Sequence, residues 1–188
     1  MNQVHRWICS SGHWRKKLEG DVLPWTLDGL DLGQSVLEIG PGYGFTTNWL
    51  RRRFERVTVV EIDSRLARSL GRTLHGTNAG VVQGDGTALP FRDASFTGAV
   101  AFTMLHHVSP IERQDKLLKE VCRVIRPGSI FAGVDSMGNW VMRLLHIRDI
   151  LIPIDPTALP ARFVAAGFAS PTVVTNGRAF RFAVRRHE

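Results

Sequence analysis

A short stretch near residue 40 constrains the fold more than any other part of the chain. Residues 35–39 have the apolar character of a buried strand, and the run Gly40-Pro41-Gly42-Tyr43-Gly44, the glycine loop, follows at once. Residues 46–54 then read as a helix. Closely spaced glycines allow a sharp turn and let a ligand approach the main chain with no Cβ in the way. The stretch predicts a strand–loop–helix unit that binds a ligand, although a plain strand–helix connection has the same pattern.

The rest of the chain alternates between strand-like and helix-like segments. The apolar patterns predict strands at 56–62, 80–83, 94–102 and 129–134, and helices at 64–74, capped by Ser64, and at 111–125, ended by Arg126-Pro127-Gly128. Such alternation indicates a parallel, doubly wound sheet. Asn176-Gly177 lies between two β-rich runs and predicts a hairpin. We therefore expect an α/β fold whose mostly parallel sheet ends in an antiparallel C-terminal hairpin.

Length and composition set limits on the class of protein. The 188 residues fit a single domain, 1–188, with an aromatic and basic N-terminal helical cap at 1–30. Because the apolar runs are short and no secretory signal is evident, we expect no membrane span and a cytoplasmic protein. Two cysteines, Cys9 and Cys122, are too few for a disulfide framework or a zinc cluster, so no metal site is expected.

Two carboxylates follow later strands. Glu61 lies at the end of the second predicted strand, one residue before its last, close to the spacing at which a carboxylate accepts hydrogen bonds from ribose hydroxyls. Asp85 follows the third strand, at the sheet edge where ligands of such folds bind, and its carboxylate suits an exocyclic amine such as adenine N6. A turn-forming role is the alternative for Asp85, since Asp and Gly are ordinary turn residues.

Together these motifs resemble the Rossmann-like S-adenosylmethionine-dependent methyltransferases, in particular the type 11 branch. The resemblance covers residues 35–134 and includes the post-strand segment 102–108 and the turn Arg126-Pro127-Gly128, with Ser129 where the family has glycine. It implies that the chain binds S-adenosylmethionine and releases S-adenosylhomocysteine. The cofactor-binding positions that it implies are Glu38, Gly40, Pro41, Gly42, Glu61, Ile62, Asp85, Gly86, Thr87, Phe102 and Thr103.

Specific roles follow from the same resemblance. Gly40 and Gly42 make room for the methionine part of the cofactor, and Glu38 helps to orient it. Phe102 and Thr103 direct backbone groups toward the methionine ammonium. Ile62 packs on one face of the adenine, and Gly86 and Thr87 line its edge. A nicotinamide cofactor is disfavoured because Phe45 stands where a G-x-G-x-x-G motif needs its third glycine.

Catalytic and substrate residues are less readable, because the cofactor carries the reactive group and the protein mainly aligns it. His106 and His107 lie just past the fourth strand and are candidate bases, with packing as the alternative role. Residues 136–153 lie where the family places substrate-covering insertions. Trp14, Trp140 and Arg143 are candidate substrate contacts. If they line the site, the acceptor is apolar or aromatic, with Arg143 or Arg148 available to an anionic group.

The acceptor that we expect is a small molecule. The net charge of +7 also suits a nucleic acid, and residues 38–47 resemble the ribosomal RNA adenine dimethylases as well. Those enzymes, however, carry N-L-P-Y/F after the fourth strand, where this chain has Phe102-Thr103-Met104-Leu105. The basic residues are also dispersed, so nucleic acid is the less favoured partner. A non-catalytic cofactor-binding protein is the third alternative.

Overall fold

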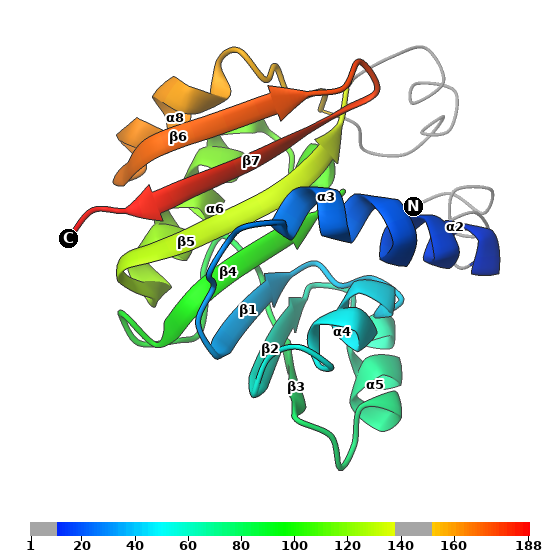
Figure 1. The fold of residues 1–188 in the computed structure, drawn as a ribbon. Coiled ribbons are helices and arrows are strands. Elements are labelled where there is room, and N and C mark those ends of the chain that lie inside the picture. Colours follow the sequence, from blue (N-terminus) through cyan, green and yellow to red (C-terminus); the bar gives the residue numbers. More distant parts are fainter. Residues whose placement is uncertain (1–10, 138–151) are drawn as a thin grey trace.

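The computed structural model describes residues 11–137 and 152–188. Seven strands form one sheet in the order β3-β2-β1-β4-β5-β7-β6 (Figure 1). The strands are β1 (Ser35–Ile39), β2 (Arg56–Glu61), β3 (Ala79–Gln83), β4 (Phe96–Phe102), β5 (Ile125–Ser136), β6 (Phe168–Thr175) and β7 (Ala179–Arg186). The first five run parallel, whereas β7 is antiparallel to both β5 and β6. The expected doubly wound α/β sheet with a C-terminal antiparallel hairpin is confirmed.

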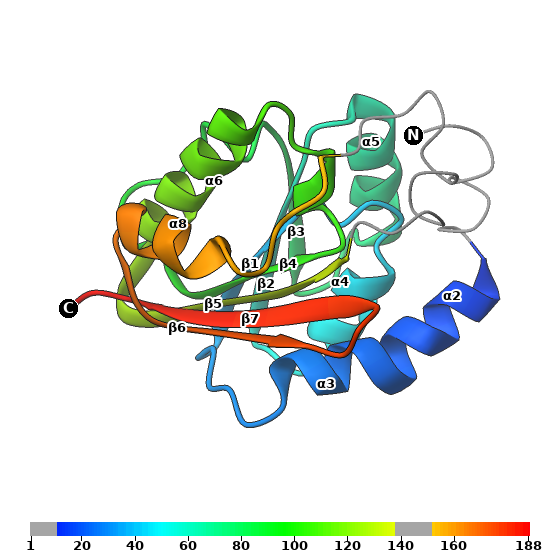
Figure 2. The same cartoon turned by 90° about the horizontal axis from the view of Figure 1, so that it is seen from above.

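Helices cover both faces of the sheet. They are α2 (Gly12–Lys17), the π-helical turn η1 (Leu18–Val22), α3 (Leu23–Leu27), α4 (Phe45–Leu50), α5 (Ser64–Thr73), the 3-10 turn η2 (Leu105–His107), α6 (Ile111–Val124) and α8 (Leu159–Ala165). One buried cluster joins α6 and α8 to the sheet, and a second joins α3, α4 and α5 to it. Figure 2 shows α6 and α8 on one side of β5 and β7, with α3 on the other.

The C-terminal hairpin owes its form to its turn and to its alternating pattern. Asn176 Oδ1 accepts hydrogen bonds from the backbone N–H of Arg178 and of Ala179, and Gly177 adopts a φ of 80° that suits glycine. On β7, Phe180 and Phe182 are buried on one face. Because a strand's side chains alternate, this places the aromatic residues in the core beneath α8 and Arg181 and Arg185 on the opposite face.

Several expected boundaries were wrong. The cap of α5 is Asp63 rather than Ser64, because the Asp63 carboxylate accepts hydrogen bonds from the N–H groups of Arg65 and Leu66. Helix α4 ends at Leu50, well before residue 54. The helix before β5 does stop ahead of Arg126-Pro127-Gly128, but this tripeptide lies inside β5 and not in a separate turn. Such errors at element ends are usual because local patterns say little about where pairing begins.

The N-terminal helices are tied to the sheet. Arg181 on β7 donates a hydrogen bond to the carbonyl of Trp25, and its guanidinium lies 5.5 Å from the centre of the Trp25 ring. Residues 138–151 lie outside the described residues, so the expected insertion at 136–153 is described only at its two ends. Within the described ranges, no helix is long and apolar enough to cross a membrane.

Candidate active site

The predicted site residues gather at one edge of the sheet. Strands β1 to β5 run parallel and in register, so their carboxyl ends meet at the edge from which the glycine loop emerges. The loop follows β1, Ile62 follows β2, Asp85 follows β3 and Thr103 follows β4. Asp135, near the end of β5, completes the row. The fold therefore brings the separate sequence motifs together.

Backbone geometry explains the glycines of the loop. Gly40, Gly42 and Gly44 have φ values of 66°, 56° and 78°, in the left-handed region that only glycine adopts readily. A Cβ on Gly44 would lie 2.4 Å from Cδ2 of Leu70, whereas a Cβ on Gly42 would have no neighbour within 4 Å. A Cβ on Gly44 would thus have to displace the end of the Leu70 side chain on α5. The space beside Gly42 leaves the loop backbone open to a ligand.

Glu38 lies beneath the loop as a buried carboxylate. It is 1% exposed and accepts hydrogen bonds from the hydroxyl groups of Thr46 and Thr47 on α4, the latter at 2.6 Å. Burial raises its pKa from 4.5 to about 7, and the two threonine hydrogen bonds oppose that rise only in part. Glu38 therefore links β1 to the first turn of the helix that follows the loop.

Glu61 connects the second strand to the same loop. Its carboxylate accepts hydrogen bonds from the N–H of Gly42 at 3.1 Å and from the N–H of Asp63 at 2.9 Å. Burial raises its pKa above the ordinary value, against the effect of these hydrogen bonds. The next residue, Ile62, is 65% exposed. An exposed apolar side chain beside a ribose-type carboxylate suits the face of a purine base.

Asp85 has a partner that sequence reasoning missed. Its carboxylate accepts a hydrogen bond from the N–H of Thr87 at 2.8 Å and forms an ion pair with Arg113 of α6 at 2.5 Å. Burial acts to raise its pKa, but these hydrogen bonds and the arginine charge lower it overall, so the group stays ionised. Thr87 itself is buried, and Gly86 lies against Leu117 of α6. Contacts from α6 thus fix the position of the loop after β3.

The segment after β4 passes close to the glycine loop. A Cβ on Gly40 would lie 3.1 Å from the Cβ of Met104, so the two segments are in contact. Phe102 is buried at the end of β4. Thr103 has a φ of 50°, uncommon for a residue with a side chain, and its N–H donates to the carbonyl of Val134 at 2.7 Å. This strained residue turns the chain toward η2, which carries both candidate histidines.

The structure separates the two histidines. His106 is 3% exposed, and its Nδ1 lies 2.5 Å from Oδ1 of Asp135, which is itself fully buried. The second oxygen of Asp135 accepts a hydrogen bond from the backbone N–H of His106 at 3.2 Å. His107 is half-buried, with its ring centre 4.1 Å from that of His106. His106 therefore makes a direct contact with a buried carboxylate of the sheet.

The sequence patterns did not single out Asp135 or Gln114. Buried Gln114 on α6 donates hydrogen bonds to the carbonyls of Leu105 and Val108, and so clasps η2 at both of its ends. Asp135 could have been found by the criterion that selected Asp85, because both are acidic residues at the carboxyl end of a strand. Gln114 gave no such signal, since its position within α6 looks ordinary in sequence.

Of the three candidate substrate contacts, Trp14 lies among the described residues. Trp14 lies half-buried on α2, with the amine of Lys17 at 6.0 Å from its ring centre. Trp140 and Arg143 lie outside the described residues. Their expected role in enclosing the acceptor stays a prediction.

Comparison with known proteins identifies the family and the fold. Residues 37–133, just over half of the chain, match the family model described as a methyltransferase domain. The chain belongs to this family, whose type 11 branch the sequence motifs resemble. A solved S-adenosylmethionine-dependent methyltransferase from Aquifex aeolicus superposes with a TM-score of 0.71 over 90% of this chain and 92% of that chain, at 20% identity. That likeness shows the fold.

Two curated relatives point to different acceptors. A fatty-acid O-methyltransferase from Mycolicibacterium smegmatis is 38% identical over 111 residues, which is 57% of this chain and 39% of the relative. Ribosomal RNA small subunit methyltransferase A from Deinococcus radiodurans is 47% identical over 135 residues, which is 63% of this chain and 46% of the relative. The chain thus spans less than half the length of either relative.

The site geometry fits the family cofactor. The space beside Gly42, the ionised Asp85 and the exposed Ile62 offer a nucleoside a backbone surface, a hydrogen-bond acceptor and an apolar face. These features lie along β1 to β3 in the order that the resemblance implies. S-adenosylmethionine is the cofactor of this family of methyltransferases.

Proposed function

We propose that this chain transfers a methyl group from S-adenosylmethionine to a small-molecule acceptor. In this proposal, Glu61 accepts hydrogen bonds from the ribose hydroxyls, and Asp85 from the adenine amine. Ile62 packs on the adenine face, while Gly40, Pro41 and Gly42 border the methionine part. When bound, the cofactor supplies an electrophilic methyl group, and the protein supplies alignment and exclusion of water.

The single observation that carries the proposal is the set of carboxylates around the glycine loop. Glu61 is fixed by the N–H of Gly42, so the ribose-type acceptor and the loop backbone form one unit. Asp85 stays ionised beside exposed Ile62 at the neighbouring strand end. Because this constellation needs three separate strands in register, a plain strand–helix connection does not account for it.

The segment after β4 supports a small molecule over a nucleic-acid base. It reads Phe102-Thr103-Met104-Leu105, with Phe102 and Leu105 buried. It offers neither the side-chain amide nor the aromatic platform that the adenine dimethylases present there. Both side chains belong to the buried core clusters, so they present no hydrogen-bonding group to a base.

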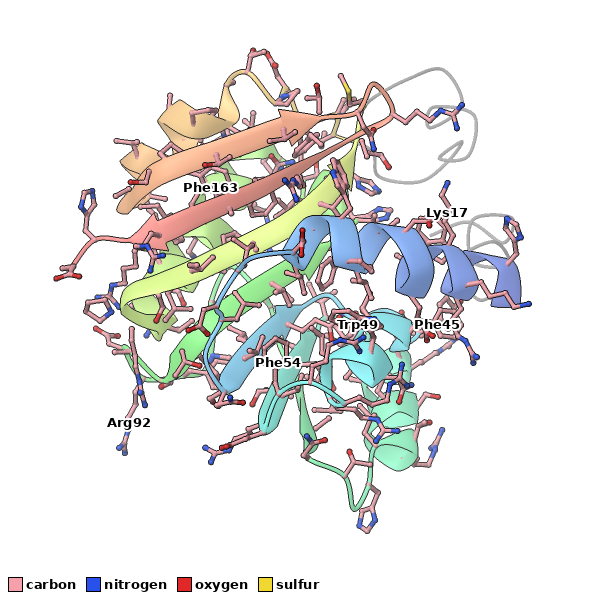
Figure 3. All side chains as sticks on the ribbon, viewed as in Figure 1. Lys17, Phe45, Trp49, Phe54, Arg92 and Phe163 are labelled. Atoms are coloured by element: carbon pink, nitrogen blue, oxygen red, sulfur yellow. The ribbon has the colours of Figure 1, made fainter. Side chains whose placement is uncertain are left out.

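The charge distribution supports the same conclusion. Lys17 on α2 and Arg92 before β4 project from opposite ends of the molecule (Figure 3). Other arginines are engaged within the protein: Arg123 pairs with Glu120 and Asp93, Arg162 pairs with Asp115, and Arg186 donates to two backbone carbonyls. Among the described residues, these pairings engage part of the positive charge that a phosphate backbone would need.

A ribosomal RNA acceptor is the second candidate, favoured by the 47% identity to the Deinococcus protein. The test is a transfer assay with methyl-labelled cofactor against a small-molecule pool and an RNA pool, with RNA retention measured at rising salt. Label in the small-molecule pool, with no salt-sensitive RNA retention, is expected. Label in RNA would overturn the small-molecule acceptor.

Calorimetric titration with S-adenosylmethionine and S-adenosylhomocysteine tests the third alternative, a non-catalytic cofactor-binding protein. Binding of both ligands together with label transfer is expected. Binding without transfer to either pool would favour a non-catalytic cofactor-binding protein. Failure of both ligands to bind would contradict the methyltransferase proposal altogether.

A further inference from the structure

We infer that Arg113 of α6 is a positioning residue for the cofactor: by holding one oxygen of the Asp85 carboxylate, it makes the site select a purine with an amine at position 6 over one with a carbonyl there. This inference rests on the proposed binding of S-adenosylmethionine and deepens it. It gives Arg113 a role that the sequence motifs do not indicate.

The first support is the geometry of the Asp85 carboxylate. One oxygen accepts a hydrogen bond from the backbone N–H of Thr87 at 2.8 Å, and the other accepts one from the guanidinium of Arg113 at 2.5 Å. A carboxylate oxygen has two acceptor positions, so each oxygen keeps one for a ligand. Because both oxygens are held, the side chain cannot rotate freely. The acceptor positions that remain are thus fixed in direction.

The second support is the place of Asp85 beside an apolar side chain. Glu61 and Gln83 are paired at the ends of β2 and β3, and the N–H of Gly84 donates to the carbonyl of Glu61 at 3.0 Å. Asp85 and the exposed Ile62 therefore follow adjacent, paired strand ends. An apolar side chain next to a polar acceptor suits the face and one edge of a purine. The Asp85 side chain is 36% exposed, so it is open to such a ligand.

The third support is that Arg113 comes from a helix that is fixed in place. The next residue, Gln114, is buried and donates hydrogen bonds to two backbone carbonyls of the η2 segment. A Cβ on Gly86 would lie 2.9 Å from Cδ1 of Leu117, one turn further along α6. Helix α6 is thus tied to η2 and packed against the loop after β3. The guanidinium therefore reaches Asp85 from a backbone that is already in position.

The charge of Arg113 also determines what Asp85 can recognise. Burial acts to raise the pKa of Asp85, but the hydrogen bonds from Thr87 and Arg113 and the arginine charge lower it overall. An ionised carboxylate accepts hydrogen bonds and cannot donate one. It therefore matches an exocyclic amine, which donates. It opposes a carbonyl oxygen, because that oxygen presents lone pairs to a charged acceptor and both groups stay unpaired.

A direct bond from Arg113 to the base is the competing role, since the guanidinium has donors that Asp85 does not use. The two roles differ in the selectivity that they predict. If Arg113 acts through Asp85, its removal weakens binding of the purine with an amine. If it donates to the base itself, its removal weakens binding of the purine with a carbonyl.

The test measures, by calorimetry, the affinity of the full chain for S-adenosylhomocysteine and for S-inosylhomocysteine, in which a carbonyl replaces the purine amine. We expect the native chain to bind the adenosyl ligand at least about tenfold more tightly. In Arg113→Ala, this preference should fall about threefold through weaker adenosyl binding. Arg113→Lys should restore most of the preference, because a single nitrogen of Arg113 contacts Asp85.

Two controls separate positioning from a general effect of charge. In the Asp85→Ala background, Arg113→Ala should have no further effect, since a positioning residue acts only through the group that it holds. Lys116→Ala removes another exposed charge from α6 and should leave both affinities within about twofold of native. Circular dichroism checks that each variant is folded.

Several outcomes would overturn the assignment. They are an unchanged preference in Arg113→Ala, an equal loss in Lys116→Ala, an effect that persists without the Asp85 carboxylate, and a loss confined to the inosyl ligand. Equal native affinity for the two ligands would also overturn the selection, although S-adenosylmethionine would still be the cofactor. Native binding of neither ligand would instead overturn the proposed function itself.

Discussion

The two halves of the sheet's carboxyl edge use acidic residues in opposite ways. Along β1, β2 and β3, the carboxylates accept hydrogen bonds from the backbone or from threonines, and Asp85 remains about a third exposed. At β4 and β5, Asp135 is fully buried and contacts an imidazole. Asp85 is exposed enough to meet a ligand, whereas Asp135 is fully enclosed beside His106. Carboxylates at equivalent strand ends thus have different environments, because different groups surround them.

The largest expected effect is in the glycine loop. Gly44→Ala forces a left-handed residue to carry a Cβ into Leu70. We expect a loss of about 3 kcal/mol in the free energy of unfolding, from left-handed strain and overpacking together. Chemical denaturation measures it. The matched control, Gly42→Ala, has a similar φ but open space, so it should lose only about 1 kcal/mol. Equal losses in the two variants would contradict the packing role of Gly44.

Glu38 provides a test by pH. Its pKa is about 7 in the folded protein against 4.5 as the ordinary value, so folding takes up a proton between these values. This contribution to stability is complete below pH 4.5 and is lost as the pH rises to about 7. Its size is up to about 3 kcal/mol. Denaturation of the native chain from pH 4.5 to 8 should show this decline, and Glu38→Gln should show a flatter curve. A native profile matching that of Glu38→Gln would mean that Glu38 titrates normally.

Glu61→Ala should affect ligand binding more than stability. Removing the carboxylate deletes the proposed ribose hydrogen bonds and the contact to Gly42, so we expect S-adenosylmethionine affinity to fall about a hundredfold, or about 3 kcal/mol. Isothermal titration measures this, with Glu61→Gln as the control of smaller effect. An unchanged affinity in Glu61→Ala would remove Glu61 from the site.

The smallest effect is expected at the Asp85–Arg113 pair. Both side chains are partly exposed, at 36% and 45%, so breaking the pair with Arg113→Ala should change stability by only about 0.5 kcal/mol. Asp85→Ala should weaken cofactor binding about tenfold, because it also removes the proposed acceptor for the adenine amine. If Arg113→Ala weakens binding as much as Asp85→Ala does, the arginine contributes to the cofactor site directly.

The contrast between the two halves of the sheet edge also explains which features could be predicted from the sequence. The alternation of strands and helices follows from periodicity, and the hairpin follows from Asn176-Gly177, because both signals act locally. The cofactor residues are readable because they follow strands within short motifs around Gly40, Glu61 and Asp85. Asp135 and Gln114 act through contacts 29 and 9 residues away from their partners, which no local pattern encodes. Pairings of this kind, such as Arg113 with Asp85, emerge only when the strands and helices are assembled.

Calorimetric titration of S-adenosylmethionine into the native chain, Glu61→Ala and Asp135→Asn tests the division between the two halves most directly. The affinity should fall about a hundredfold in Glu61→Ala and stay within about threefold of native in Asp135→Asn. Equal losses in the two variants, or a loss confined to Asp135→Asn, would contradict the assignment of the cofactor to β1–β3.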